Sequence, residues 1–192
     1  MSFSVPKKVV LIGASTGGPG QIQKIIDSLP ILSNTSIVIA QHMVDGFINS
    51  FTKRLQVNSD NSVKLIQDKQ TFEKSTVYIA QGEAKINKKT SSFEFSYKPA
   101  TKESFNPDIN VLFNSFLPLA KDVNILNVIL TGIGDDGVES CKYLSEHGAR
   151  CVTESKQSAI VDGMPNRARS SIENIEVHDI KEIVNIISEF CE

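Results

Sequence analysis

Short apolar runs recur along the chain, and most of them are separated by segments whose apolar residues repeat every three or four positions. The runs, which are typical of buried parallel strands, cover residues 9–12, 37–40, 63–66, 77–80, 125–130 and 151–153. Strands that alternate with helices predict βαβ units with right-handed crossovers. We therefore expect an α/β fold: a three-layer αβα sandwich around a mostly parallel, doubly wound sheet.

Segments with the helical repeat lie between these runs. They cover residues 17–30, 45–56, 106–120, 138–148 and 179–191. The apolar positions of the first three, each set on one helix face, are Ile22, Ile25, Ile26 and Leu29; Phe47, Phe51 and Leu55; and Ile109, Leu112, Phe113 and Phe116. Local signals set the helix ends: Pro30 ends the first, Asn106 is the expected N-cap of the third with Pro107 at its first position, and Gly148 stops the fourth.

Residues 77–97 differ from the rest of the chain. Here TVYIAQ, a lysine-rich turn region and SFEFSY alternate polar and apolar residues with period two, which predicts an antiparallel β-hairpin attached to the sheet. No internal repeat, low-complexity segment or linker divides the chain, so residues 1–192 are expected to form a single domain.

Composition narrows the class of protein. The 192 residues, 40% of them hydrophobic and 22% charged, have the balance of a globular protein with a full core. A net charge of −2 gives no general attraction to nucleic acid or anionic membrane. The first apolar run is too short for a signal peptide or a membrane span, which favours the cytoplasm. The three cysteines, Cys141, Cys151 and Cys191, are an odd number and include no CxxC pair. We therefore expect reduced, packed thiols that bind no metal.

The most informative stretch is VVLIGASTGGPG, residues 9–20. A phosphate-binding P-loop would need lysine where Pro19 stands. A dinucleotide fold wants glycine where Ser15 stands and an acidic residue after the second strand, where the sequence reads IAQHM. An anion held at the helix N-terminus stays an open alternative.

The same stretch also fits GxSxG, in which a strand turns sharply into a helix and presents a serine. Ser15 would then be a nucleophile, and the amide of Thr16 an oxyanion donor. A serine hydroxyl is weakly nucleophilic, so this hypothesis requires a histidine base and a carboxylate that orients it.

His42 and the pair Asp135 and Asp136 follow other predicted strands, so they belong to the same edge of the sheet as Ser15. Taken alone, His42 could be a structural strand-end histidine, and the aspartates could cap a helix or, less readily, bind magnesium. His147 and His178 fit surface or capping positions better. The chain order Ser, His, Asp differs from the Ser, Asp, His order of α/β-hydrolases.

At the level of whole motifs, the sequence resembles the catalytic domain of the chemotaxis protein-glutamate methylesterase family, CheB. The matching stretches are IGASTGGPG, IAQHM, GFINSFTKRL, VYIAQG, ILTGIGDDG and GMPNRA. The resemblance implies an αβα sandwich with a hairpin, and hydrolysis of glutamate γ-methyl esters on the cytoplasmic helices of methyl-accepting chemotaxis receptors, with deamidation of receptor glutamines in many members. It implies Ser15 as nucleophile, His42 as base, Asp136 as orienting acid, backbone amides of Thr16 and Ile133 as oxyanion donors, and no metal or organic cofactor.

The chain departs from the family pattern at the rim of the expected site. Ile133 stands where methionine is common, Asn106 replaces an arginine, Lys156 aligns with an acidic residue and Lys85 with a histidine. The family's receiver domain is missing before the first catalytic strand, so we expect an enzyme that is not switched by a phosphorylated domain of its own. Two alternatives are a noncatalytic adaptor that binds receptors or a methyltransferase, and a general serine esterase or amidase. The oligomeric state is left open.

Overall fold

The computed structural model of the chain describes residues 5–90, 92–101 and 105–192. The strands are β1 (Lys8–Ala14), β2 (Thr35–Gln41), β3 (Ser62–Leu65), β4 (Thr76–Ile79), β5 (Glu83–Lys88), β6 (Phe93–Lys98), β7 (Asn124–Ile129), β8 (Arg150–Glu154) and β9 (Glu176–His178). The α-helices are α1 (Gly18–Asp27), α2 (Asp45–Val57), α3 (Ile109–Asn114), α4 (Val138–Glu146), α5 (Gly163–Ser171) and α6 (Ile180–Cys191). A 3₁₀ turn, Leu117–Leu119, follows α3.

A seven-stranded sheet forms the middle layer, in the order β3-β4-β2-β1-β7-β8-β9. All of its pairs are parallel, and β1 lies between β2 and β7. The predicted α/β class is confirmed. Because β1, β2 and β7 are neighbours and parallel, the residues that follow them meet at one edge of the sheet.

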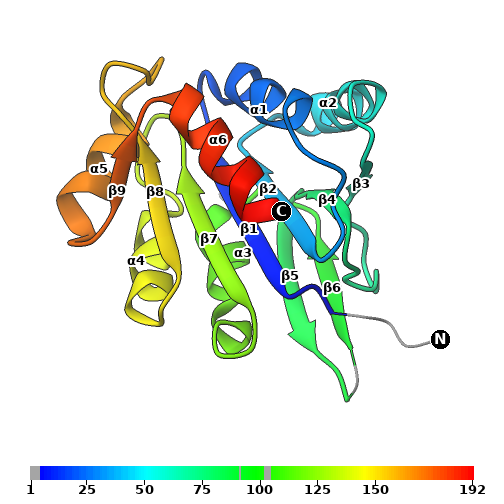
Figure 1. Cartoon of the computed structure of the whole chain (residues 1–192). Helices are drawn as coiled ribbons and strands as arrows, with labels where there is room; N and C mark the ends of the chain where they lie inside the picture. The colour runs from blue at the N-terminus through cyan, green and yellow to red at the C-terminus, as the bar shows by residue number, and fades with distance from the viewer. Residues whose placement is uncertain (1–4, 91, 102–104) are drawn as a thin grey trace.

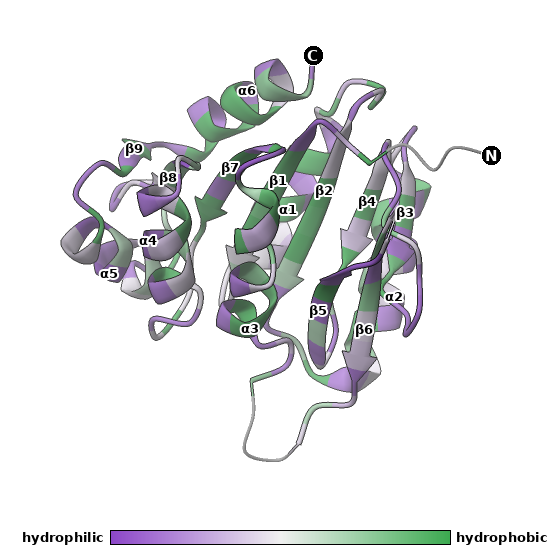
Figure 2. Ribbon diagram, turned by 90° about the horizontal axis from the view of Figure 1, so that it is seen from below, coloured by the Kyte–Doolittle hydropathy of each residue, from purple (hydrophilic) through white to green (hydrophobic). Residues whose placement is uncertain are grey.

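Helices cover both faces of the sheet (Figure 1). Helices α1, α2 and α6 pack apolar side chains such as Ile25, Phe51 and Ile183 into one hydrophobic cluster with the inner strands. Helices α3, α4 and α5 belong to a second cluster on the other face, which also contains Phe95 of β6. Figure 2 shows β1 and β2 coloured mostly as hydrophobic, whereas α6 carries both colours, as expected of a helix with one face in solvent.

The predicted hairpin exists, but its first strand was wrongly placed. TVYIAQ contains β4 of the parallel sheet, and the hairpin pairs β5 with β6 as a separate antiparallel sheet. The segment that the sequence suggested as a lysine-rich turn is therefore β5. Its Ala84 and Ile86 are buried while Lys85 and Asn87 face solvent, which is the alternation of a half-buried strand.

Two predictions about helices are also wrong. The N-cap of α3 is Asp108, whose side chain accepts a hydrogen bond from the Val111 amide, and Asn106 and Pro107 precede the helix, joined by a cis peptide bond. Phe47 is 65% exposed, and Ile48 takes the buried position on α2. The three cysteines are free and buried, as predicted.

Candidate active site

Ser15 lies at the turn between β1 and α1. Its amide donates to the carbonyl of Thr131 (3.0 Å), and its carbonyl accepts from the amide of Gly18 (2.9 Å), so both backbone groups of the serine are held. Gly17 closes the turn with φ of +85°, a left-handed conformation that a side chain would oppose, particularly with Ile160 packed against it. The sharp strand-to-helix turn expected around Ser15 is therefore present.

His42 directly follows β2, and its amide donates to the carbonyl of Ala14 at the end of β1 (2.9 Å). The imidazole is largely buried, with 15% of its side chain exposed. The ring of Phe105 stacks on it at a centroid distance of 5.0 Å and an interplanar angle of 6°. This stack, together with the backbone bond, restricts the orientation of the ring.

Asp136 lies in the turn after β7 and is 3% exposed. Its carboxylate accepts hydrogen bonds from the backbone amides of Ile109 (Oδ2, 2.9 Å) and Asn110 (Oδ1, 2.9 Å), at the start of α3. These amides stabilise the negative charge and fix the carboxylate plane. The neighbouring Asp135 is exposed, so the second aspartate of the pair is the one that faces the histidine.

The structure brings Ser15, His42 and Asp136 together. His42 Nε2 lies 2.7 Å from Asp136 Oδ2, and His42 Nδ1 lies 3.3 Å from Ser15 Oγ. A carboxylate only accepts hydrogen bonds, so Nε2 carries a proton and, in the neutral ring, Nδ1 is free to accept the serine proton. A hydroxyl in this arrangement can be activated as a nucleophile without a metal ion.

The two amides predicted as oxyanion donors belong to Thr16 and Ile133. Within the described ranges, neither amide donates a hydrogen bond to the protein, so both are available to a ligand. Ile133 is also exposed, at 66%. Their neighbours are fixed: the amide of Gly132 donates to Val161 O, and Gly132 accepts from the Met164 amide.

Gly132 packs directly against Ser15. A Cβ atom at position 132 would lie 2.7 Å from Ser15 Cβ and 2.4 Å from Met164 Sδ, both far inside van der Waals contact. The close approach of the two strand ends therefore requires glycine here.

A buried carboxylate, that of Glu154, holds the segment that follows β7 in place. Glu154, at the end of β8, is fully buried and accepts from the Thr131 amide (3.0 Å), from Gln21 Nε2 (2.7 Å) and from the Ser158 hydroxyl (2.8 Å). Burial raises the pKa of Glu154, although these hydrogen bonds oppose the shift. Glu154 thereby helps to fix Thr131, whose carbonyl holds the amide of Ser15.

A groove of about 720 Å³ lies beside His42. Its lining residues are His42, Met43, Val44, Asp45, Ala100, Thr101, Phe105 and Asn106. Asn106 contributes through its amide, which donates to Met43 O and Asp45 Oδ1 and accepts from the Gly82 amide. The structure thus places Asn106 in the groove wall, whereas Lys85 and Lys156 are exposed on β5 and after β8.

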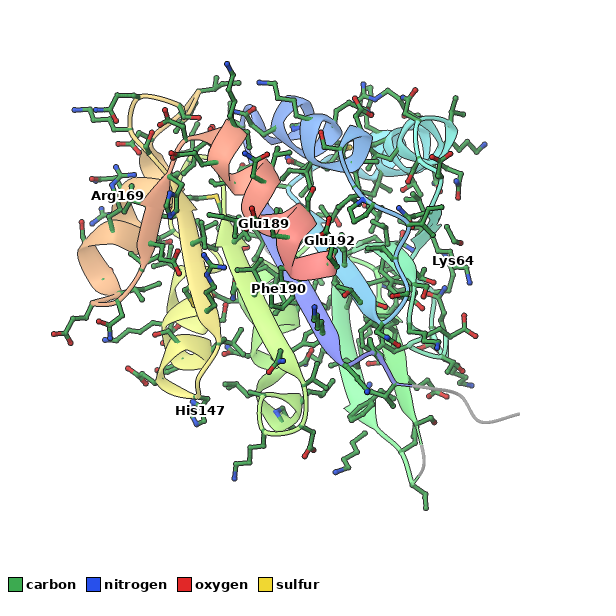
Figure 3. The ribbon with its side chains drawn as sticks, viewed as in Figure 1. Lys64, His147, Arg169, Glu189, Phe190 and Glu192 are labelled. Atoms are coloured by element: carbon green, nitrogen blue, oxygen red, sulfur yellow. The ribbon has the colours of Figure 1, made fainter. Side chains whose placement is uncertain are left out.

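The other histidines lie away from Ser15. His147 ends α4, with Nδ1 2.7 Å from Tyr143 O, and Figure 3 shows it at the amino-terminal edge of the sheet. His178 pairs with Glu176 and Glu182. Both match the predicted surface or capping positions. Among the residues that the structure describes, no three His, Cys, Asp or Glu side chains are grouped to hold a metal ion, and no helix there is long and apolar enough to span a membrane.

Two residues near Ser15 and His42 were missed from the sequence. Phe105 lies outside every periodic segment, so no pattern points to its ring. Gln41 stands inside IAQHM, and it was read only as the end of a strand. Its polar side chain at a fully buried strand position is the signal that could have identified it.

Comparison with known proteins gives consistent results. Residues 10–187 match the family model described as CheB methylesterase. A protein-glutamate methylesterase/protein-glutamine glutaminase of Carboxydothermus hydrogenoformans is 36% identical over an alignment of 167 residues that covers 84% of this chain and 47% of the relative. One of Caldanaerobacter subterraneus is 35% identical over 165 residues, 83% of this chain and 45% of the relative. The chain spans about half the length of these curated relatives.

The crystal structure of the Thermotoga maritima CheB methylesterase catalytic domain is similar over nearly its whole length. The match has a TM-score of 0.86 and 28% sequence identity, and covers 96% of this chain and 99% of the other. A family model that covers most of the chain, together with this structural match, leads to one conclusion. The chain belongs to the CheB methylesterase family.

Proposed function

We propose that this protein hydrolyses glutamate γ-methyl esters on the cytoplasmic helices of methyl-accepting chemotaxis receptors, through Ser15, His42 and Asp136. The observation that carries the proposal is the chain of two hydrogen bonds from Asp136 through His42 to Ser15. Family membership and the names of the relatives support this substrate class, and also a second reaction, deamidation of glutamine. The protein would act in the cytoplasm, where these receptor helices lie.

In the proposed reaction, His42 Nδ1 takes the proton of Ser15 as Oγ attacks the ester carbonyl. The amides of Thr16 and Ile133 donate to the oxyanion, and Asp136 stabilises the imidazolium. The imidazolium then protonates the leaving methoxide, which departs as methanol. Water, deprotonated by His42, attacks the acyl-enzyme and releases glutamate and free Ser15. With glutamine as substrate, the same steps release ammonia.

The test is release of labelled methanol from receptor membranes that carry labelled methyl esters. Ser15→Ala should lower the rate by about 10⁴-fold or more, because the nucleophile is lost. Ser170→Ala is the matched control, since Ser170 is an exposed serine of α5 that bonds to Asn166 O, and it should keep the wild-type rate.

Each alternative predicts a different outcome. A noncatalytic adaptor would release no methanol and would bind receptors equally well with Ser15→Ala. A general esterase would hydrolyse small esters but not receptor methyl esters. No methanol release from the wild-type protein would disprove the proposed function.

A further inference from the structure

The side chain of Gln41 bridges the two residues that exchange the proton. Its Nε2 atom donates to the carbonyl of Ser15 (2.8 Å) and to the carbonyl of His42 (2.9 Å). Gln41 is 1% exposed, so these bonds do not compete with water. From this geometry we infer that Gln41 is a positioning residue, which sets the distance between Ser15 and His42.

The bridge is needed because the sheet ends just before both residues. The last partners of the β1–β2 ladder are Ala14 and Gln41, so Ser15 and His42 lie one residue beyond it. Beyond these partners, one more backbone hydrogen bond joins the two segments, from the His42 amide to Ala14 O. The amide of Gln41 links the carbonyls of Ser15 and His42, and so extends the connection between the strands by one residue.

The orientation of the Gln41 amide follows from its neighbours. Two carbonyl oxygens face one end of the amide, so that end must be the NH₂ group. The Oε1 atom at the other end has no hydrogen-bond partner among the described residues. It occupies the space beside Gly18, where a Cβ atom would lie 2.0 Å from it. A glycine of the serine turn therefore makes room for the bridge, although a buried acceptor is left unpaired.

The gap between Ser15 Oγ and His42 Nδ1 makes this positioning matter. At 3.3 Å it is already long for a hydrogen bond from a hydroxyl, so a small further separation weakens proton transfer strongly. Displacement of a reacting group by about 1 Å lowers a rate by about 100-fold. Loss of the bridge should reduce the reactivity of Ser15 and leave substrate binding unchanged.

The chain contains a matched control in a second Ile-Ala-Gln sequence, residues 79–81. Gln41 is the last residue of β2, and Gln81 lies two residues after the end of β4, also a parallel strand. Gln81 likewise donates through Nε2 to a backbone carbonyl, that of Ile66 (2.8 Å). Among the described residues, its side chain forms no hydrogen bond with Ser15 or His42. Gln41→Met and Gln81→Met therefore remove the same chemical group from equivalent sequence positions with different partners.

The experiment measures the rate at which a fluorophosphonate labels Ser15, together with kcat and KM for methyl ester hydrolysis and the thermal midpoint Tm. Gln41→Met should lower the labelling rate and kcat by about 100-fold with little change in KM, whereas Gln81→Met should label like the wild type. Gln41→Asn, which keeps a polar amide but is one methylene shorter and cannot span both carbonyls, serves if the methionine variant does not fold. It should show the same loss.

If folded Gln41→Met or Gln41→Asn is labelled at the wild-type rate, the inference is wrong. An equal loss of labelling rate in Gln81→Met would also overturn it. The inference rests on the proposed function only through the reactivity of Ser15. If Ser15 of the wild type is labelled but the protein releases no methanol from receptors, the proposed substrate is wrong. The role of Gln41 is then still tested by the labelling rates. If the wild type does not label at all, both are wrong.

Discussion

His42 Nε2 lies 2.7 Å from Asp136 Oδ2, and this contact decides which ring nitrogen faces Ser15. Because the carboxylate accepts the proton of Nε2, the neutral ring presents Nδ1 as the acceptor to the hydroxyl. The two amide donors from α3 keep Asp136 in this orientation. The base therefore depends on the start of α3 as well as on the strand that carries it.

Asp136→Asn should lower kcat for ester hydrolysis by about 10⁴-fold. An asparagine can present its NH₂ group to Nε2, which would favour the tautomer with the proton on Nδ1, and it cannot stabilise the imidazolium. Asp135→Asn is the matched control, because Asp135 is exposed, and it should keep the wild-type kcat. Equal losses in both variants would contradict the assignment of the orienting acid to Asp136.

Gly132→Ala should damage both stability and activity. The added methyl group would press on Ser15 Cβ and Met164 Sδ, and overpacking of this kind costs about 1–3 kcal/mol in free energy of unfolding. Urea denaturation and fluorophosphonate labelling of Ser15 would measure the two effects.

The matched control for that change is Gly20→Ala. Gly20 lies in α1, and apart from the adjacent helix backbone no heavy atom lies within 4 Å of the position of its Cβ, so alanine should stabilise the helix by about 0.5–1 kcal/mol. Labelling of Gly132→Ala at the wild-type rate would mean that Ser15 tolerates the displacement.

Phe105→Ala should reduce kcat by about 2- to 10-fold, because an aromatic pair of this kind contributes about 0.5–1.5 kcal/mol beyond its buried area. The stack is lost, and the imidazole of His42 gains rotational freedom and contact with water. Phe105→Tyr keeps the ring and should retain most of the activity. If the alanine and tyrosine variants have the same kcat, the stack does not orient His42.

The sheet and the meeting of Ser15, His42 and Asp136 could be predicted because they depend on order along the chain. Apolar runs mark β1, β2 and β7, and residues that follow parallel neighbours share an edge. Strand order itself was not needed for this inference, since every parallel strand ends at that edge.

Other features depend on contacts between distant segments, which a local pattern does not report. Asn106 is a good capping residue by type, but its amide bonds instead to Met43 and Gly82, and Asp108 caps α3. The lysines of β5 favoured a turn in the sequence. Its alternation of buried and exposed residues results from packing against α3. The two hydrogen bonds of Gln41 likewise depend on where its side chain points. The spacing of residues along one strand does not predict this direction.

The stability of the protein should depend on pH through Glu154. Burial raises the pKa of Glu154 above its ordinary value of 4.5, so between the unfolded and folded pKa values the folded state binds more protons than the unfolded state. The free energy of unfolding contributed by this group therefore falls as pH rises through that window, by at most about 1.4 kcal/mol per pH unit.

Glu154→Gln removes this titration, so the free energy of unfolding of the variant should improve relative to wild type as the pH rises from the ordinary pKa of 4.5 toward the raised pKa of the folded state. The slope of that difference is the measured quantity, because the amide also changes the bonds to Gln21 and Thr131. Glu176→Gln is a control of opposite sign: Arg150 lowers the pKa of Glu176, so the wild type should gain on this variant as pH rises. A difference for Glu154→Gln that is independent of pH would show that the buried carboxylate titrates as it does in the unfolded chain.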